Sequence, residues 1–336
     1  MDVLGLTFRE LCERLAPRRH EIRDLRGVYR RLCLGEAESL LHGGVVLTAE
    51  TWPVVRSVRE EELTKFVQRD PAGLEIESVM VPMSRRGRCW TTLCVSSQIG
   101  CARGCRFCAT ARMGHVRDLT AAEMVGQVTA ARRQFGAQVR NVVFMGMGEP
   151  FDNFDGVIQA VRVLTDRAGL SMAAERISIS TVGRTEGIRR LAELGWRRIN
   201  LAVSLNASND DIRSRIMPVN RLEPMGRLRE ALLAYPLRRC QFFMIEYVLI
   251  PGVNDAPGHA AELAGFLRPL KSVVNVIPYN PVPGVDWPAP TEEQIAAFIG
   301  ALKACGLVVK RRLTKGRGQM AACGQLGNPA LRALGA

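Results

Sequence analysis

The sequence lacks any hydrophobic run that reaches the roughly 18 residues of a membrane-spanning helix, so no membrane partner is expected. It also lacks a signal-peptide leader after Met1, which predicts a cytoplasmic protein. There is no internal repeat or low-complexity segment, and 47% of the residues are hydrophobic, so neither a fibre nor a disordered chain is indicated. A chain of 336 residues can form one large domain with a smaller appendage.

Acidic residues are scarce relative to basic ones. The chain has 33 Asp and Glu against 46 Lys and Arg, a formal net charge of +13. Such an excess favours a polyanionic partner, because neutralised phosphates release counterions. Nucleic acid is therefore the first candidate partner, and a basic enzyme without such a partner is the alternative.

The chain has ten cysteines but no recognisable secretory signal. This combination favours thiol, metal or redox chemistry over a framework of disulfides. Five of them fall within twenty residues, between Cys89 and Cys108, and one lies in the tail. The other four lie in apolar-patterned segments and are predicted to be core residues, because a free cysteine packs as a small hydrophobe. They are Cys12, Cys33, Cys240 and Cys305.

From about residue 91, β-rich runs alternate with amphipathic helical runs, which predicts an α/β fold with a parallel sheet and crossover helices. The predicted strands are 91–97, 141–145, 176–181, 199–205, 241–249, 273–278 and 307–313. The predicted helices are 120–135, 154–168, 186–194, 225–234, 257–267 and 291–305. Thr120 with Glu123, and Thr291 with Gln294, have the spacing of capping boxes.

Three regions are predicted. Residues 1–72 show no strand alternation and are expected to form a helical accessory domain that binds RNA, with Thr7 capping its first helix. Residues 73–310 form the α/β core, and the glycine-rich residues 311–336 form a loop extension. Ligands of parallel α/β folds bind at the carboxyl ends of the strands, where the polar motifs of this sequence fall.

Three cysteines follow the first predicted strand on one short loop: Cys101, Cys105 and Cys108. Iron–sulfur clusters are usually held by four thiolates, so three leave one iron open to a substrate. Reductive cleavage of S-adenosylmethionine requires this arrangement, since the open iron is chelated by the methionyl amine and carboxylate. The alternatives are a zinc knuckle with His115 as fourth ligand, or three unconnected core thiols.

A glycine-rich motif, G-M-G-E-P, follows the second predicted strand. Gly148 lets the backbone approach a ligand closely, and the carboxylate of Glu149 can accept from an ammonium group. Either residue also suits a plain turn. The other predicted cofactor-binding residues lie at the ends of later strands, where they are equally compatible with ordinary strand positions: Ser180, Ser204, Leu205, Asn206 and Asn280.

Five strings in this order resemble the RlmN/Cfr family of radical S-adenosylmethionine RNA methyltransferases: L-C-V-S-S-Q-I-G-C, F-M-G-M-G-E-P, E-Y-V-L-I-P-G-V-N-D, I-P-Y-N-P-V-P-G and A-A-C-G-Q-L. The resemblance covers nearly the whole chain. It implies a partial (β/α)6 TIM-like radical SAM barrel, a [4Fe–4S] cluster, and two molecules of S-adenosylmethionine per turnover. It also implies RNA as substrate and an electron donor such as flavodoxin or ferredoxin.

The resemblance further implies three catalytic residues. One S-adenosylmethionine methylates Cys323, and a radical made from the second takes a hydrogen atom from that methyl group. The resulting methylene radical adds to carbon 2 of an adenine in 23S rRNA, tRNA or both. Cys94 then attacks the Cys323 sulfur, which frees the product as a disulfide forms, and Glu77 accepts a proton. Without the resemblance, either cysteine is compatible with core packing.

Radical chemistry suits this target, because carbon 2 of adenine is electron-poor and has no lone pair with which to attack a sulfonium. Alternatives remain: carbon-8 methylation within the same family, a divergent paralogue with another RNA target, or a zinc-stabilised RNA-binding module without catalysis. Departures from the usual family pattern keep the paralogue open. They are Asn206 for histidine, Gln319-Met320 in the tail, and an insertion at 85–90.

An RNA-facing surface is predicted from segments in which basic residues outnumber acidic ones. Its members are the arginines between Arg18 and Arg31, together with Arg85, Arg86, Arg88, Lys310, Arg311, Arg312, Lys315 and Arg317.

Overall fold

The chain was analysed as a computed structural model that describes residues 1–17, 24–42, 44–60, 63–85, 87–312 and 324–327. These residues form two compact units. Unit 1 holds Met1–Ile99 and Val116–Ile177, and unit 2 holds Gly100–His115 and the chain from Ser178 onward. No helix among the described residues is both long enough and apolar enough to span a membrane.

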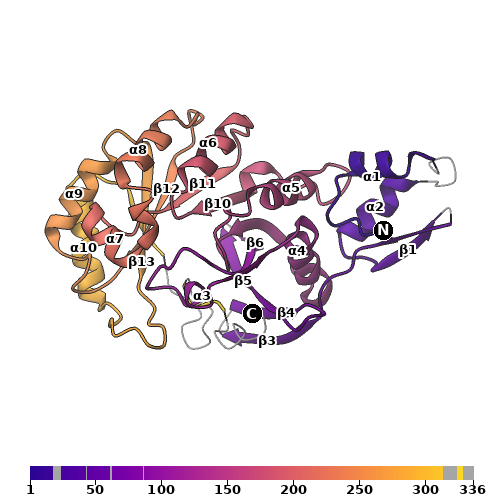
Figure 1. The fold of residues 1–336 in the computed structure, drawn as a ribbon, viewed down its shortest axis with the longest axis horizontal. Helices are drawn as coiled ribbons and strands as arrows, with labels where there is room; N and C mark the ends of the chain where they lie inside the picture. The colour runs from indigo at the N-terminus through magenta and orange to yellow at the C-terminus, as the bar shows by residue number, and fades with distance from the viewer. Residues whose placement is uncertain (18–23, 43, 61–62, 86, 313–323, 328–336) are drawn as a thin grey trace. The chain divides into compact units, whose positions relative to one another are not determined.

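Unit 1 begins with two helices and a small hairpin (Figure 1). The elements are α1 (Phe8–Arg14), α2 (Leu25–Cys33), β1 (Ser39–His42) and β2 (Val45–Thr48). Thr7 caps α1 in a capping box, as the sequence predicts. The amide of Phe8 donates to Asp166 Oδ2 at 2.6 Å, which ties the start of α1 to the end of a later helix in the same unit.

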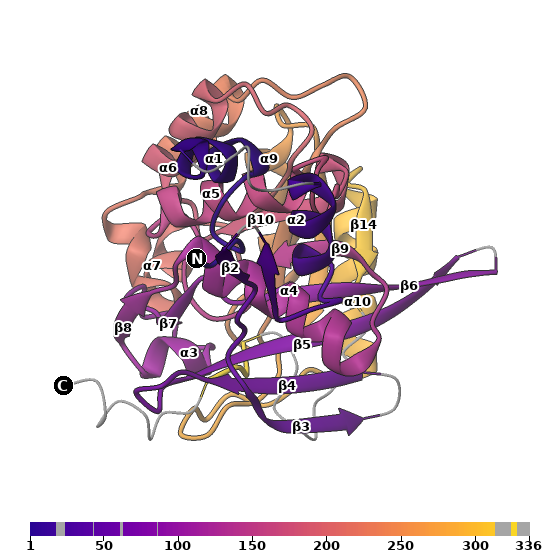
Figure 2. The same ribbon diagram turned by 90° about the vertical axis from the view of Figure 1, so that its right-hand side faces the viewer.

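The sheet of unit 1 has the order β9-β6-β5-β4-β3. Its strands are β3 (Val54–Glu60), β4 (Leu63–Arg69), β5 (Glu75–Arg85), β6 (Arg88–Val95) and β9 (Val139–Phe144). Figure 2 shows β3 to β6 side by side, and they pair antiparallel, whereas β9 runs parallel to β6. The helices of this part are α4 (Ala121–Phe135), begun by the predicted capping box at Thr120, and α5 (Phe154–Thr165).

The prediction of a helical domain over residues 1–72 is wrong for its second half, which contains β1 to β4. The predicted boundary at residue 72 separates β4 from β5, although the two strands pair in register, with Val67 opposite Glu77. The sequence analysis did not predict strand β4, because four successive residues of it are buried: Lys65, Phe66, Val67 and Gln68. A strand that is covered on both faces shows no alternation of apolar and polar residues.

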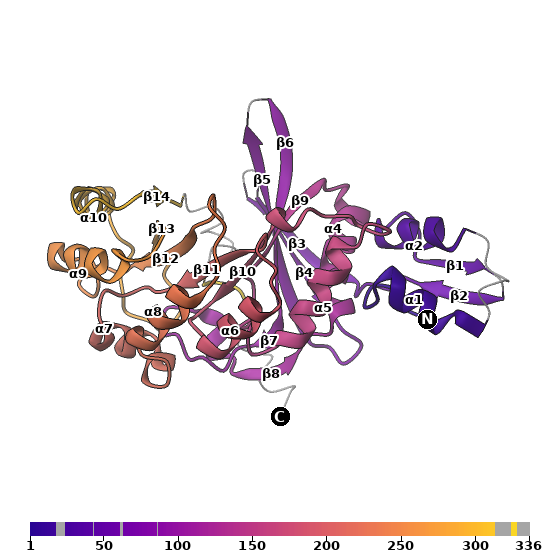
Figure 3. The same cartoon turned by 90° about the horizontal axis from the view of Figure 1, so that it is seen from above.

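Unit 2 contains parallel strands joined by helices, which confirms the predicted α/β pattern. The strands are β10 (Ile177–Thr181), β11 (Asn200–Ser204), β12 (Phe243–Leu249), β13 (Ser272–Pro278) and β14 (Val309–Arg311). The helices are α6 (Thr185–Glu193), α7 (Asp210–Ile216), α8 (Met225–Ala234), α9 (Pro257–Leu267) and α10 (Glu292–Ala304). Helices α9 and α10 lie beside β12 and β13 (Figure 3). Thr291 caps α10 in the predicted capping box.

Short elements adjoin the three-cysteine segment in the chain: β7 (Gln98–Gly100), α3 (Ala109–Arg112) and β8 (His115–Asp118). Two short 3-10 turns, Ala174–Arg176 and Pro218–Arg221, complete the described elements. None of the nine cysteines that the structure describes forms a disulfide. Cys33 is buried as predicted, but the core prediction is wrong for Cys240 and Cys305, which are exposed, and Cys12 is half-buried.

Candidate functional site

The three-cysteine loop lies in unit 2, between Gly100 and α3. Cys101 and Cys105 are 8% and 7% exposed, and Cys108 is half-buried. The amide of Cys101 donates to Gly114 O at 2.7 Å and closes the base of the loop. Gly100 has a φ of +74°, and a Cβ at this position would overlap Gly114 O, so this position requires glycine. The loop therefore holds all three thiols on one tightly closed turn.

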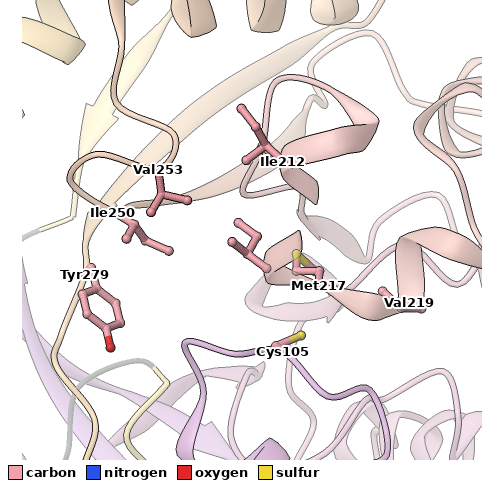
Figure 4. Packing of buried hydrophobic residues seen from close by; sticks show 9 residues of the cluster. Cys105, Ile212, Met217, Val219, Ile250, Val253 and Tyr279 are labelled. Atoms are coloured by element: carbon pink, nitrogen blue, oxygen red, sulfur yellow. The ribbon is translucent and has the colours of Figure 1, made fainter. Parts of the chain in front are cut away.

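The loop rests on the carboxyl ends of the unit 2 strands, where the sequence predicts ligands to bind. Cys105 joins a buried cluster with Ala207, which follows β11, Ile250, which follows β12, and Tyr279, which follows β13. Figure 4 shows Cys105 in this cluster together with Met217. These contacts fix one of the three thiols against the sheet.

Two of the four described tail residues, Gly324 and Leu326, are hydrogen-bonded to α3, which directly follows this loop. The amide of Ala109, next to Cys108, donates to Gly324 O at 2.6 Å, and Thr110 Oγ1 donates to Leu326 O at 2.6 Å. Gln325 Nε2 donates to Pro281 O at 3.0 Å. Cys323, the predicted methyl acceptor, lies outside the described residues, and Gly324 follows it directly in the chain.

The predicted cofactor residues of unit 2 are all at least partly buried at strand ends. Ser180, Leu205 and Asn280 are buried, and Ser204 is half-buried. Asn206 adopts a φ of +59°. Its Oδ1 accepts the amide of Val248 at 2.9 Å, and its Nδ2 lies 3.3 Å from Met217 Sδ. The Asn206 side chain thus joins the ends of two strands, and its contact with a cofactor stays a prediction.

Two buried side chains near these strand ends were missed from the sequence. Asn254 is fully buried, and its Nδ2 donates to Asn206 O at 2.8 Å and Val248 O at 2.7 Å. Arg213 is also fully buried, and it donates to Leu205 O at 3.2 Å and to Val182 O. Burial lowers the pKa of Arg213 to about 10, because it disfavours the charged guanidinium. Most residues of α7 are charged or polar, a pattern that is typical of a solvent-exposed helix, so nothing in the sequence indicated that Arg213 is buried.

A cavity of about 450 Å³ opens beside the cysteine loop in unit 2. Its lining includes Cys105, Arg106, Arg112 and Trp287. The Trp287 ring packs edge-on against Tyr279, with 6.0 Å between ring centroids. Guanidinium groups beside an indole are a combination that binds nucleotides. None of the lining residues outside the cysteine loop was predicted, because isolated arginines and a lone tryptophan give no sequence pattern.

The G-M-G-E-P motif is built in unit 1. Glu149 is 2% exposed, its backbone amide donates to Gln98 Oε1 at 2.8 Å, and its Oε1 accepts the amide of Phe151 at 3.1 Å. Gly148 has a φ of +100°, and a Cβ there would stand 2.6 Å from the Cβ of Gln98. The motif is therefore packed tightly on the chain that leads into β7.

Replacing Gly148 with alanine is expected to lower the free energy of unfolding by more than about 2 kcal/mol, because backbone strain adds to the clash with Gln98. Gly195 provides a matched control. It also has a positive φ, +65°, but a Cβ there meets nothing within 4 Å. Urea unfolding of both variants measures the difference, and equal losses would show that the Gly148 contact is unimportant.

Glu77 and Cys94 share one face of the unit 1 sheet. Cys94 lies directly opposite Val79, and Glu77 is two residues from Val79 on β5. Residues two apart on a strand point to the same face, so the two side chains are diagonal neighbours. Both are buried, at 4% exposure for Glu77 and 7% for Cys94. The sheet thus brings together the two described residues that the sequence analysis predicts to be catalytic.

Lys65, which the sequence analysis missed, lies on the same face of β4. Its Nζ lies 3.5 Å from Glu77 Oε2, and the two side chains are 9% and 6% exposed. A buried carboxylate beside a buried ammonium is held as an ion pair. Lys65 is therefore a positioning residue for the Glu77 carboxylate.

Replacing Lys65 with methionine is expected to lower the free energy of unfolding by about 3 kcal/mol, because the buried Glu77 carboxylate would lose its ion pair with the Lys65 ammonium. The double variant Lys65→Met/Glu77→Gln should recover most of that loss. Arg9→Ala is the control, since the Arg9–Glu13 pair is 89% and 61% exposed and its loss should have no measurable effect. Equal stability of Lys65→Met and the parent chain in urea would contradict the buried pair.

Comparison with known proteins identifies this combination of motifs. The profile of the radical SAM superfamily matches residues 95–264. The probable dual-specificity RNA methyltransferase RlmN 1 of Protochlamydia amoebophila (strain UWE25) is 42% identical over 297 residues, which cover 88% of this chain and 82% of that protein. The dual-specificity RNA methyltransferase RlmN of Syntrophotalea carbinolica (strain DSM 2380 / NBRC 103641 / GraBd1) is 39% identical over 340 residues, covering 97% of this chain and 89% of that one.

The chain belongs to the RlmN family. A radical SAM methyltransferase from Sphaerobacter thermophilus, known from a crystal structure, has 40% sequence identity to this chain. The two structures superpose with a TM-score of 0.87, and the match covers 97% of this chain and 98% of the other. The predicted fold class, a partial TIM-like radical SAM barrel, is therefore confirmed. Membership in this family also argues against the alternative of a zinc-stabilised RNA-binding module, because RlmN proteins are radical SAM enzymes with a [4Fe–4S] cluster and S-adenosylmethionine as cofactors.

The residues present fit these RlmN cofactors. Cys101, Cys105 and Cys108 lie on one closed loop and form no disulfide, and thiolates are the ligands of iron–sulfur clusters. Within the described part of the chain, no three His, Cys, Asp or Glu side chains converge on a point that would hold a single metal ion. A cubane does not need such convergence, because each thiolate binds a different iron. The three cysteines would hold the cluster, and its fourth iron would be open to S-adenosylmethionine.

Proposed function

We propose that this RlmN-family enzyme methylates carbon 2 of an adenosine in 23S rRNA, tRNA or both. The observation that carries the proposal is the three-thiol loop at the strand ends, with the chain beside Cys323 attached to it. The cluster, when bound, would supply the electron that cleaves S-adenosylmethionine to a 5′-deoxyadenosyl radical. All other parts of the reaction are assigned to side chains of this chain.

Cys323 is the methyl carrier in this proposal. Support comes from the hydrogen bond between Ala109 and Gly324, which attaches the residue after Cys323 to the residue after Cys108. A thiol carrier is needed because carbon 2 of adenine cannot attack a sulfonium directly. The carrier keeps the methyl carbon within the site, where a hydrogen atom can be removed from it.

Cys94 and Glu77 complete the transfer. After the methylene radical adds to adenine carbon 2, the adduct must lose one electron, for which the oxidised cluster would be the acceptor, and Glu77 accepts the proton from carbon 2. The thiolate of Cys94 then attacks the Cys323 sulfur, so that the disulfide bond forms as the carbon–sulfur bond breaks. The electron pair of the broken bond stays on the methylene carbon, which takes up a proton to become the new methyl group. Their common position on one buried face of the unit 1 sheet supports a shared task, and Lys65 would hold the Glu77 carboxylate in place.

The substrate and the setting also belong to the proposal. The names of the relatives describe dual-specificity RNA methyltransferases. For this chain we propose RNA as the substrate, with the target adenosine in 23S rRNA, tRNA or both. The target adenosine must leave its stack to reach a site at the strand ends. An electron donor such as flavodoxin or ferredoxin would reduce the cluster, and the cytoplasm is the proposed location.

Nucleoside mass spectrometry tests this function. Ribosomal RNA and tRNA from a strain that lacks the gene would be incubated with the anaerobically purified enzyme, then digested to nucleosides. We expect 2-methyladenosine in one or both RNAs. Detection of 8-methyladenosine without the 2-methyl isomer would instead assign the chain to the carbon-8 branch of the family, and methylation of neither RNA would favour a paralogue with another target.

A further inference from the structure

The hairpin formed by β5 and β6 continues well beyond the rest of the unit 1 sheet. Strand β4 pairs with β5 only as far as Met80, and β9 pairs with β6 only from Thr91. Beyond these points, the pairs from Met83–Trp90 to Arg85–Arg88 are made between β5 and β6 alone, among the residues described. Figures 2 and 3 show this two-stranded end extending away from its neighbours. We call the described residues 81–85 and 87–90 the basic ribbon.

The charge at the end of the basic ribbon is of one sign. Arg85 and Arg88 are both exposed and lie directly opposite each other in the ladder. The sequence from Val79 to Val95 contains no acidic residue. Within the described chain, neither guanidinium forms a salt bridge. Like charges that face each other across a hairpin destabilise it. An anionic partner bound between the two arginines would remove this repulsion.

The two arginines share their face of the ribbon with apolar side chains. Opposite residues point to the same face, and Met83 lies opposite Trp90, one step further along that face. Met83 is 42% exposed. The guanidinium carbon of Arg140 lies 5.0 Å from the centre of the Trp90 ring, which steadies the base of the ribbon. The charged end is therefore presented by a braced strand pair.

A second predicted basic run, at β14, makes contacts within the molecule at its three described residues. On β14, Arg311 pairs with Glu292 at 2.5 Å and 2.7 Å, and Lys310 lies 5.9 Å from the ring centre of Phe242. Arg312, directly after β14, lies 4.0 Å from Glu246. Lys315 and Arg317 of the same run lie outside the described residues. The three described charges serve internal contacts, whereas those of the basic ribbon face solvent, so the ribbon is better supported as an RNA-facing surface than this run.

We propose that the basic ribbon binds the phosphate backbone of the substrate RNA, with Arg85 and Arg88 each contacting phosphate oxygens. The proposal rests on the proposed function, since it names a surface for that same substrate. Guanidinium groups form paired hydrogen bonds to phosphate, and folded RNA is recognised largely through its backbone and shape. A ribbon of this kind would fix the register of the RNA without reading its sequence.

The test is RNA binding by the full-length, cluster-loaded enzyme over a series of salt concentrations. The variant is Arg85→Gln/Arg88→Gln. The matched control is Arg238→Gln/Arg239→Gln, which removes two exposed arginines from the turn before β12. Loss of two phosphate contacts should make the slope of log K against log salt shallower by about 1.4 to 1.8, and the control should keep the parent slope. Unfolding in urea should be unchanged or slightly improved in the ribbon variant.

Three other outcomes would overturn the proposal, and the measurements distinguish them. A parent-like slope in the ribbon variant, with the parent still methylating RNA, would remove the ribbon from RNA binding and leave the function intact. If that variant also showed slow reduction by flavodoxin but normal reduction by dithionite, the face would belong to the electron donor. A parent chain that neither binds nor methylates RNA would refute the proposed function itself.

Discussion

Cys105→Ala should purify as a colourless protein with almost no iron, compared with about four irons per chain in the parent, and should produce no 5′-deoxyadenosine. The physical reason is that the three-cysteine loop offers no spare thiol. Cys105 also packs in the buried cluster below the loop, but alanine leaves only a small gap there, so the chain should still fold. Iron analysis, visible absorption and nucleoside chromatography measure the three effects.

Cys240→Ala is the control for this variant, because Cys240 is exposed and lies before β12. It should keep the iron, the colour and the cleavage activity of the parent. Cys105→Ala that retained a full cluster and cleaved S-adenosylmethionine would contradict the assignment of the loop as the cluster site.

The two cysteines outside the cluster loop should fail at different steps. Cys323→Ala should still cleave S-adenosylmethionine but carry no protein-bound methyl group and form no methylated RNA. Cys94→Ala should accept the methyl group and attach it to RNA, then stall, because no thiolate attacks the Cys323 sulfur. Electrophoresis under denaturing conditions should show RNA joined to protein in Cys94→Ala only.

Results of two kinds would contradict these assignments. Full methylation by Cys323→Ala would remove the tail from the mechanism. Normal methylation by Cys94→Ala, without any adduct, would make Cys94 a packing residue of β6, in keeping with its 7% exposure. Cys33→Ala is a suitable control for burial alone, because Cys33 is fully buried in α2 and outside the proposed chemistry.

Sequence periodicity predicted the α/β core well because its elements are long and regular. The helix with its capping box at Thr120 and the one at Thr291 begin where predicted. Strand β5 was missed for a physical reason. Glu75–Met80 is buried at six successive positions, so it carries no period of two, and the polar Glu75, Glu77 and Ser78 within it suggest a loop.

The candidate site was only partly readable from the sequence. The spacing of the three cysteines encodes a loop, so local sequence is sufficient to predict it. By contrast, Lys65 acquires its meaning from a partner on the next strand, and Arg213 from carbonyl groups that three different loops supply. Such contacts depend on strand register and loop packing, which one sequence does not reveal.

The most direct test of the account uses S-adenosylmethionine whose methyl group carries three deuterium atoms. If the methyl group passes through Cys323 and loses one hydrogen atom to the deoxyadenosyl radical, the 2-methyladenosine formed should retain two deuterium atoms in its new methyl group. The third should appear in 5′-deoxyadenosine. A product that retains all three deuterium atoms would show direct transfer of an intact methyl group and would contradict the central claim.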